Sequence, residues 1–251
     1  MLYIVGSPIG NLSDISLRAL EVLRHVNRIA AEDTRRIRIL LNHYEIEKPL
    51  LSYHEFNEAK RTAEIIQYLE QGESIALVSD AGMPSISDPG FRLISRCQQN
   101  QIPFTVIPGP SAVTTALVGS GLPTDKFYYG GFLPNKSGRR ERELRAALQR
   151  EASSIYFESP YRLLKTLETL NSLEPTCQIC VARELTKHFE EFRRGTVSEL
   201  REHFATHTPK GEITLIIAPG TDKKERERAE ATDSSANAGD EREHGEREDE
   251  R

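Results

Sequence analysis

The sequence lacks tryptophan and contains only three cysteines, Cys97, Cys177 and Cys180, among its 251 residues. An odd and sparse cysteine count is typical of proteins in a reducing compartment, so we expect a cytoplasmic location. Cys177 and Cys180 form a CxxC pair, but neither a second pair nor a nearby histidine accompanies them. We therefore interpret the pair as two small apolar residues at the start of a strand, and we expect no metal site.

Long apolar runs are absent, and no basic segment precedes the first apolar stretch, residues 2–5. No stretch is long enough to span a bilayer, and no signal peptide is recognisable at the N-terminus. We therefore expect no association with a membrane.

Apolar residues make up only 37% of the chain, and the shortage is local. Residues 222–251 contain 7 Lys/Arg and 12 Asp/Glu with almost no large apolar group, which predicts a disordered, charged tail. Residues 1–221 hold 26 basic and 26 acidic side chains. A neutral body can still carry a basic face, so the net charge does not exclude RNA as a partner.

Two phosphate-binding fingerprints are also missing. The first Gly-rich loop reads GSPIGN at residues 6–11 instead of GxGxxG, and GxxxxGK[ST] does not occur. A dinucleotide and the phosphate chain of ATP are therefore disfavoured as ligands.

Short apolar runs typical of strands alternate with helical patterns along the sequence, which indicates an α/β fold. We predict a first domain over residues 1–122 with a mostly parallel sheet. After a short linker at residues 123–126 the strands become longer and more mixed. We therefore predict a second α/β domain over residues 123–221 with a mixed sheet.

Three apolar strands, at residues 2–5, 75–78 and 104–107, each lead into a loop rich in glycine and proline. In open α/β sheets ligands bind beyond the carboxyl ends of the strands, so we expect a ligand at these loops. Asp80 is the first charged side chain after the second of these strands, and Gly82 would let a ligand approach the backbone. The alternative is that the loops are only tight turns.

Several long segments, in order over residues 2–220, resemble the RsmI-type methyltransferases of the tetrapyrrole methylase fold group. These segments are LYIVGSPIGNLSDISLRAL, AAEDTRRIRILLNHY, SYHEFNE, ALVSDAGMPSISDPG, VIPGPSA, GFLP, FESPYRL, ARELTKHFEE and KGEITLII. The resemblance implies two α/β domains, S-adenosylmethionine in the cleft between them, and a homodimer. It also implies methylation of a cytidine ribose 2′-hydroxyl in small-subunit (16S) ribosomal RNA.

The same resemblance points to cofactor-binding residues in each of the three loops. By their match to the family motifs these are Ile9, Asp80, Ala81, Gly82, Met83, Ser111 and Ala112. Members that act on tetrapyrroles usually have a GxGxGD first loop, whereas Pro8 and Asn11 replace the middle glycine and the aspartate here. Arg36 also departs from the family pattern, which has a histidine or a similar residue at that position.

A basic segment at residues 134–145 is the expected contact with RNA phosphates. It follows a strand and begins with turn formers, so we predict that it is exposed, with Lys136, Arg139, Arg140 and Arg142 as its cations. The alternative is an ordinary solvated helix with ion pairs. Farther upstream, Tyr53, His54 and Phe56 either stack on a splayed base or belong to the edge of the core.

Methyl transfer to a ribose hydroxyl would benefit from a base, or from a cation that stabilises the alkoxide. The candidates are Asp33, Glu158, Glu184 and Lys187, which follow predicted strands, and we favour Asp33 and Lys187. Each could instead be a helix cap or part of an ion pair between domains. Residues 210–212 are expected to line the cofactor cleft.

Two other functions stay open from the sequence. The first is a methyltransferase of the same fold that acts on a small tetrapyrrole, which would not need the basic segment. The second is a non-catalytic RNA-binding protein, which would not bind S-adenosylmethionine.

Overall fold

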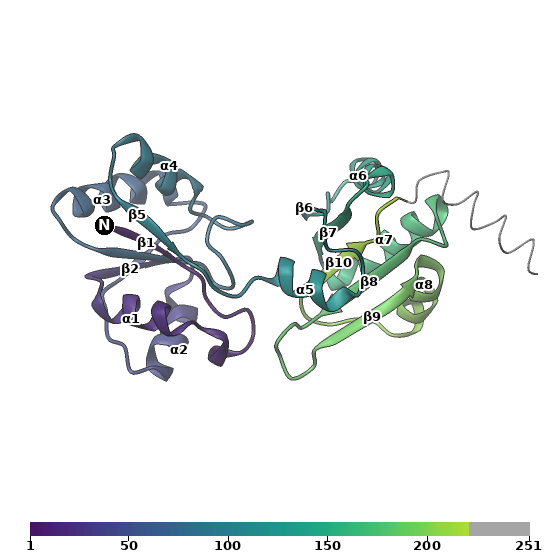
Figure 1. Cartoon of the computed structure of the whole chain (residues 1–251), viewed down its shortest axis with the longest axis horizontal. Helices are drawn as coiled ribbons and strands as arrows, with labels where there is room; N and C mark the ends of the chain where they lie inside the picture. Colours follow the sequence, from purple (N-terminus) through teal and green to yellow (C-terminus); the bar gives the residue numbers. More distant parts are fainter. Residues whose placement is uncertain (221–251) are drawn as a thin grey trace, which may run out of the picture.

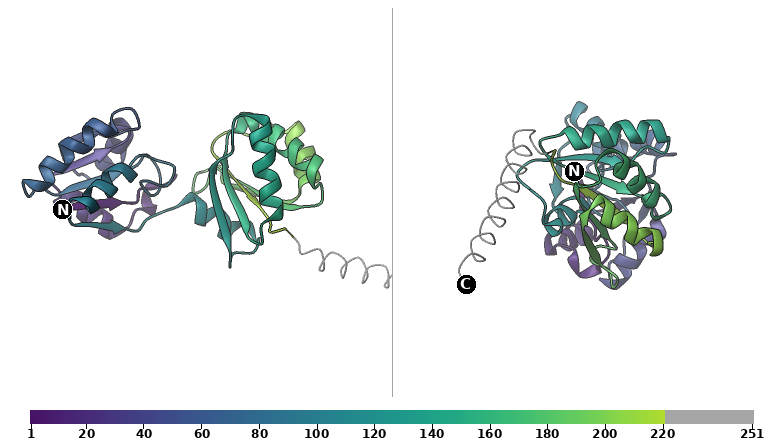
Figure 2. Two further views of the ribbon diagram at one scale, coloured as in Figure 1. Left: turned by 90° about the horizontal axis from the view of Figure 1, so that it is seen from above. Right: turned by 90° about the vertical axis from the view of Figure 1, so that its right-hand side faces the viewer.

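The computed structural model describes residues 1–220, and the predicted disorder of residues 222–251 lies outside them. The described chain forms two α/β units that lie next to each other along the long axis of the molecule (Figures 1 and 2). Each unit contains one five-stranded sheet. The α/β class with a parallel first sheet and a mixed second sheet, predicted from the sequence, is confirmed.

The first sheet has the strand order β3-β2-β4-β1-β5, and all neighbours are parallel. Its strands are β1 (Leu2–Val5), β2 (Arg28–Ala31), β3 (Leu50–Ser52), β4 (Ile75–Val78) and β5 (Phe104–Ile107). β4 is central and buried at every position, as its unbroken apolar run predicts. The three strands that precede the Gly/Pro-rich loops are neighbours in the sheet, so their carboxyl ends share one edge.

Two pairs of helices cover the two faces of the first sheet (Figure 1). One face carries α1 (Leu17–His25) and α2 (Thr34–His43), and the other carries α3 (Glu58–Glu70) and α4 (Phe91–Gln99). A short 3₁₀ helix, Leu12–Asp14, precedes α1. The Ser16 hydroxyl accepts a hydrogen bond from the Ala19 amide and so begins α1 in the usual way for an N-cap serine.

The second sheet has the order β6-β7-β10-β8-β9, in which only β6 and β7 are parallel. Its strands are β6 (Phe127–Phe132), β7 (Ser153–Glu158), β8 (Gln178–Arg183), β9 (Glu191–Thr196) and β10 (Ile213–Ile217). Its outer face packs against α6 (Ser137–Gln149), α7 (Pro160–Leu173) and α8 (Val197–Thr206). Thr196 and Glu199 form a capping box that begins α8.

Helix α5 (Ala112–Ser120) connects the two units but packs on the second sheet. Val113, Ala116 and Leu117 lie in one apolar cluster with residues of β7, β8 and β10. Its small-residue face fits this position because the ring of Phe192 approaches Gly119 so closely that a Cβ there would clash. The predicted boundary near residue 122 therefore assigns α5 to the first domain, whereas its packing joins it to the second.

The three apolar strands expected at residues 2–5, 75–78 and 104–107 are confirmed as β1, β4 and β5. Among these residues, no helix has the length and apolar character needed to cross a membrane.

Leu23 and Leu17 lie on the same helix but differ completely in burial, at 0% and 80% exposed. We predict that Leu23→Ala lowers the free energy of unfolding by about 2–5 kcal/mol because it leaves a cavity under α1. Leu17→Ala, the matched control, is expected to change it by less than about 0.5 kcal/mol. Urea denaturation followed by circular dichroism measures both, and equal effects would contradict the assigned face of α1.

Candidate active site in the cleft between the domains

The loops after β1 and β4 are joined by backbone hydrogen bonds. The Ser7 amide donates to the Gly82 carbonyl oxygen at 2.9 Å, and the Gly82 amide donates back to Ser7 at 3.1 Å. The Ser7 hydroxyl, which is buried, also donates to the Ser79 carbonyl oxygen at 3.1 Å. Gly82 has a φ of 79°, a left-handed conformation that glycine adopts without strain. The two loops therefore form one backbone frame.

The third loop, after β5, touches the first at two glycines. A Cβ on Gly6 would lie 2.8 Å from the Cα of Gly109 and 2.6 Å from the sulfur of Met83. Real Cβ contacts with backbone atoms are not this short, so both positions exclude any side chain. The glycines of these loops thus serve close packing of the three loops against one another.

A cleft of about 480 Å³ lies beyond these loops, between the two units. All seven residues that the resemblance assigns to the cofactor line it, namely Ile9, Asp80, Ala81, Gly82, Met83, Ser111 and Ala112. The second unit contributes Phe132, Phe157, Glu158, Leu185, Gly211, Glu212, Ile213 and Thr214, among others. The expectation that the segment before the last strand lines the cleft is confirmed for Gly211 and Glu212, whereas the cofactor role of all these residues stays a prediction.

Asp80 is held in place at the floor of the cleft. One carboxylate oxygen accepts a hydrogen bond from the Asp33 amide at 2.9 Å, and the other lies 3.4 Å from the guanidinium of Arg36. Arg36 also lines the cleft. The residue that departs from the family pattern therefore places a cation beside the carboxylate of Asp80.

Two further carboxylates, those of Glu32 and Asp88, also line the cleft. Neither was among the candidate residues found in the sequence. Burial, and then the nearby charge of Asp80, raises the pKa of Glu32. Burial, and then the charge of Glu32, raises the pKa of Asp88 to about 6. Within SDPG an aspartate is also a common turn residue, so its sequence context does not distinguish the two roles.

Of the four catalytic candidates, Glu158 is the one that lines the cleft. Its carboxylate is buried and fully engaged, because it pairs with Arg162 and accepts hydrogen bonds from the Thr166 hydroxyl at 2.6 Å and the Ser159 amide at 2.7 Å. These contacts fix the start of α7. Its catalytic role stays a prediction.

Asp33 caps α2 and pairs with Arg35 at 2.7 Å, and these hydrogen bonds lower the pKa of its carboxyl. Lys187 bridges Glu184 at 2.9 Å and Glu212 at 2.8 Å. Burial favours the neutral amine of Lys187, but the hydrogen bonds to the two glutamates outweigh it and raise the pKa. Asp33 therefore matches the alternative of a helix cap, whereas the ion pairs of Lys187 lie within the second unit and not between domains. The catalytic roles of Asp33, Glu184 and Lys187 also stay predictions.

The basic segment falls on α6 and the loop before it. Lys136, Arg139 and Arg142 are exposed, as predicted, but Arg140 is only 7% exposed, so the expectation that it faces solvent is wrong. The helical period explains this, because Arg140 shares the inward face of α6 with Leu144 and Ala147. Its guanidinium donates to the Asn135 carbonyl oxygen at 3.4 Å.

The aromatic residues after β3 separate into two kinds. Tyr53 is buried and its hydroxyl lies 3.2 Å from the hydroxyl of Thr62. The prediction that it belongs to the core is therefore right, and the alternative that it stacks on an RNA base is wrong. Phe56 is 93% exposed, and its ring lies edge-on to that of His54 with the ring centroids 6.1 Å apart. His54 is half-buried between them.

A sequence model of the family described as "Tetrapyrrole (Corrin/Porphyrin) Methylases" matches residues 1–201. The chain belongs to this family. A protein named "Ribosomal RNA small subunit methyltransferase I" from Thermotoga maritima is 50% identical over 218 residues, which cover 86% of this chain and 97% of that relative. The protein of the same name from Hydrogenobaculum sp. is 50% identical over 220 residues, covering 86% and 95%. The resemblance found in the sequence is confirmed.

Solved structures of more distant proteins share the fold. Diphthine synthase superposes with a TM-score of 0.71 at 14% identity, covering 86% of this chain and 89% of that one. Uroporphyrin-III-C-methyltransferase from Thermus thermophilus gives 0.61 at 21% identity, covering 86% and 93%. At these identities the likeness extends to the fold of this methylase and no further.

The contact between Gly6 and Gly109 gives a direct test of the loop frame. We predict that Gly6→Ala lowers methyl-transfer activity on the order of 100-fold, because it displaces the first and third loops by a fraction of an ångström to an ångström. Gly138→Ala is the control, since a Cβ at that position meets nothing within 4 Å. Full activity of Gly6→Ala in a steady-state assay would show that the loops do not need this close approach.

Proposed function

We propose that this protein is an S-adenosylmethionine-dependent methyltransferase that methylates the 2′-hydroxyl of a cytidine ribose in small-subunit ribosomal RNA. The observation that carries the proposal is the 50% identity, over nearly the full length, to proteins named for methylation of that RNA. The cleft between the units supports it, because every expected cofactor residue lines the same cavity.

The residues of the cleft fit the chemistry of S-adenosylmethionine. Its volume, about 480 Å³, lies in the range of small-molecule sites. Ile9, Met83 and Val113 provide apolar surface for an adenine ring, and the carboxylates of Asp80 and Glu32 favour positively charged groups. When bound, the cofactor supplies an electrophilic methyl group on a sulfonium.

The protein's part in such a reaction is alignment and exclusion of water. The hydrogen-bonded frame of Ser7 and Gly82 fixes one wall of the cleft, and Phe132, Phe157 and Leu185 form an apolar wall opposite. An acceptor hydroxyl held between these walls would be oriented in line with the methyl group, which converts a bimolecular step into an effectively unimolecular one.

Exposed cations and aromatic rings at the second unit suit an RNA substrate. Lys136, Arg139 and Arg142 are exposed, and none takes part in an ion pair within residues 1–220. Phe132 lines the cleft and is 63% exposed, and Tyr161, next to the cleft residue Pro160, is 91% exposed. Proteins usually recognise single-stranded RNA with two elements, cations that bind the phosphates and aromatic rings on which the bases stack.

A homodimer is part of the same proposal. Strand β5 lies at an edge of the first sheet, and its Phe104 and Val106 are partly exposed. An uncovered apolar edge strand of this kind is a surface that proteins normally cover. Light scattering that finds only monomers at micromolar concentration would count against the dimer.

The first test of the proposal concerns the cofactor. We predict that Asp80→Asn weakens binding of S-adenosylmethionine at least about 10-fold, because it removes the negative charge that faces the cleft. Asp125→Asn, a change at an exposed position in the linker, is the control. Isothermal titration calorimetry measures both, and undiminished affinity of Asp80→Asn would remove Asp80 from the cofactor site.

The second test concerns the RNA. We predict that the double change Arg139→Ala/Arg142→Ala weakens binding of a ribosomal RNA fragment and lowers the slope of log K against log salt by about one to two. The control is Arg18→Ala/Arg24→Ala, which removes two exposed arginines from α1 in the other unit. If both double variants lose affinity equally, the cations act only through net charge and α6 is not the contact surface.

A further inference from the structure

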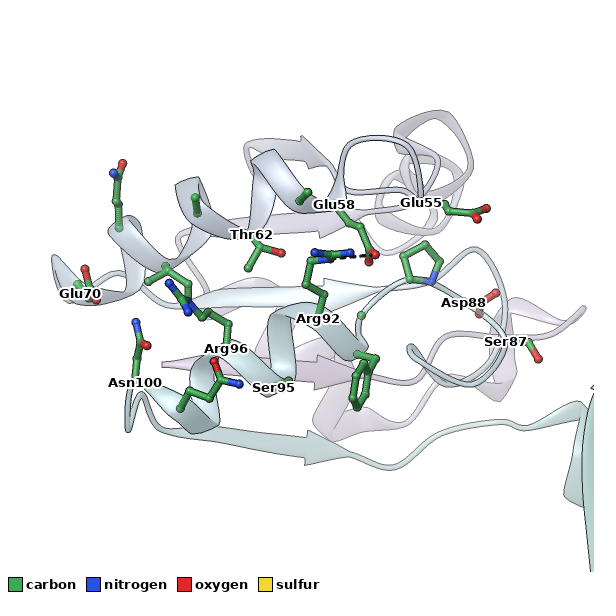
Figure 3. A pocket seen from close by; sticks show the side chains of 18 residues that line it. Glu55, Glu58, Thr62, Glu70, Ser87, Asp88, Arg92, Ser95, Arg96 and Asn100 are labelled. Carbon is green, nitrogen blue, oxygen red and sulfur yellow. Dashed lines mark hydrogen bonds and ion pairs between the residues drawn. The ribbon is translucent and has the colours of Figure 1, made fainter.

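Asp88 lines two separate hollows of the molecule. It lines the cleft that faces the second unit, and it also lines a wider groove of about 970 Å³ between α3 and α4. Figure 3 shows this groove, with Ser87 and Asp88 on the loop at one end and Glu70 and Asn100 at the other. Asp88 therefore lies at a wall of the proposed active site and at one end of the open groove between α3 and α4.

No cation is paired with Asp88 within residues 1–220. Arg36, Arg92 and Arg96 line the two hollows, and none of them pairs with Asp88; Arg36 and Arg92 pair with other carboxylates. Arg36 lies 3.4 Å from Asp80, and Arg92 lies 3.2 Å from Glu58. The groups that act on the Asp88 carboxyl are instead the carboxylates of Glu32 and Asp80 and a hydrogen bond with Ser79.

These surroundings make Asp88 a stronger proton acceptor than an ordinary aspartate. Burial destabilises its anion first, the charges of Glu32 and Asp80 add to that, and the pKa rises to about 6. A general base acts best when its pKa lies near the working pH, because it is then both deprotonated and basic.

We propose that Asp88 is a catalytic residue that accepts the proton of the acceptor hydroxyl during methyl transfer. In this step the O–H bond breaks and its proton passes to the Asp88 carboxylate, while the oxygen forms a bond to the methyl carbon. The bond between sulfur and the methyl carbon breaks, and its electron pair stays on sulfur as a neutral thioether. The inference rests on the proposed function, and the groove behind Asp88 gives the proton a path to solvent.

Other carboxylates of the cleft are less suited to this task. Glu32 also has a raised pKa, but its anion is stabilised by the backbone amide of Asp80 and by the charge of Arg36. Asp80 is committed to the Asp33 amide and to Arg36. Glu158 is engaged by Arg162 and by the Thr166 hydroxyl. Asp33, which does not line the cleft, is bound by Arg35, which lowers its pKa.

The ionisable groups around Asp88 come from several elements and set the control experiments. They are Glu32 after β2, Arg36 on α2, His54 and Glu55 after β3, Glu58 on α3, Asp80 after β4, Arg92 on α4 and Tyr129 on β6. Of these, Glu32 is the one with a resolved shift in the same direction that also lines the cleft, so it is the comparison to make.

The test compares Asp88→Asn with Glu32→Gln in the full-length protein. For the wild type, kcat should rise with pH and reach half its plateau near pH 6, because the acting form is the carboxylate. Asp88→Asn should lower kcat on the order of 100-fold or more and abolish this limb of the profile, with affinities for S-adenosylmethionine and RNA unchanged within about 3-fold. Glu32→Gln should retain the limb, displaced to lower pH because one negative charge near Asp88 is gone.

A second readout does not depend on turnover. In ¹³C spectra of the carboxyl groups of ligand-free protein, one aspartate resonance should titrate near pH 6 and be missing in Asp88→Asn. The inference is overturned if Asp88→Asn keeps its kcat and pH limb, if the variant loses cofactor affinity instead of rate, or if the resonance titrates near the ordinary aspartate value. Failure of the wild type to bind S-adenosylmethionine or methylate RNA would refute the proposed function itself, and with it this role.

Discussion

The paired backbone hydrogen bonds between Ser7 and Gly82 are the contact on which the cleft depends. They join the loops of two neighbouring parallel strands, and the approach of Gly6 to Gly109 adds the third loop to the same frame. Main-chain contacts of this kind tolerate little adjustment, because backbone atoms cannot rotate away as side chains can. A wall built from them presents Asp80 and Met83 at fixed positions.

The frame also connects the two units. Ile9, at the tip of the first loop, belongs to the apolar cluster of the second sheet together with Val113 and Leu185. A Cβ on Gly10 would lie 2.6 Å from the Leu185 carbonyl oxygen, so the turn after β8 rests directly on that loop. The ion pairs of Lys187 with Glu184 and Glu212 stabilise this turn, in which Glu184 and Thr186 adopt left-handed conformations. The cleft is therefore a product of both domains.

The sequence predicted the strands, the order of elements and the meeting of three loops, because apolar runs followed by glycine and proline have a direct physical meaning in parallel sheets. It did not predict features that depend on which face of an element is covered. Arg140 was expected in solvent because its neighbours are charged, yet the helical period turns it inward. Helix α5 is a similar case, since its partners in the second sheet are distant in the chain. The raised pKa of Asp88 depends first on its burial and then on the charges of Glu32 and Asp80, and no spacing rule in the sequence predicts this environment.

The position of α5 has a consequence for motion. Ser111 and Ala112, which line the cleft, begin a helix that is fixed to the second sheet, whereas Gly82 and Asp80 are fixed to the first. Rotation of one domain against the other about residues 108–111 would widen or narrow the cavity, and it would also move Ile9 and Gly10 relative to the turn after β8. A ligand that touches both walls thus stabilises the closed arrangement by its own binding energy, and the extended connection before α5 is the place where a hinge would act.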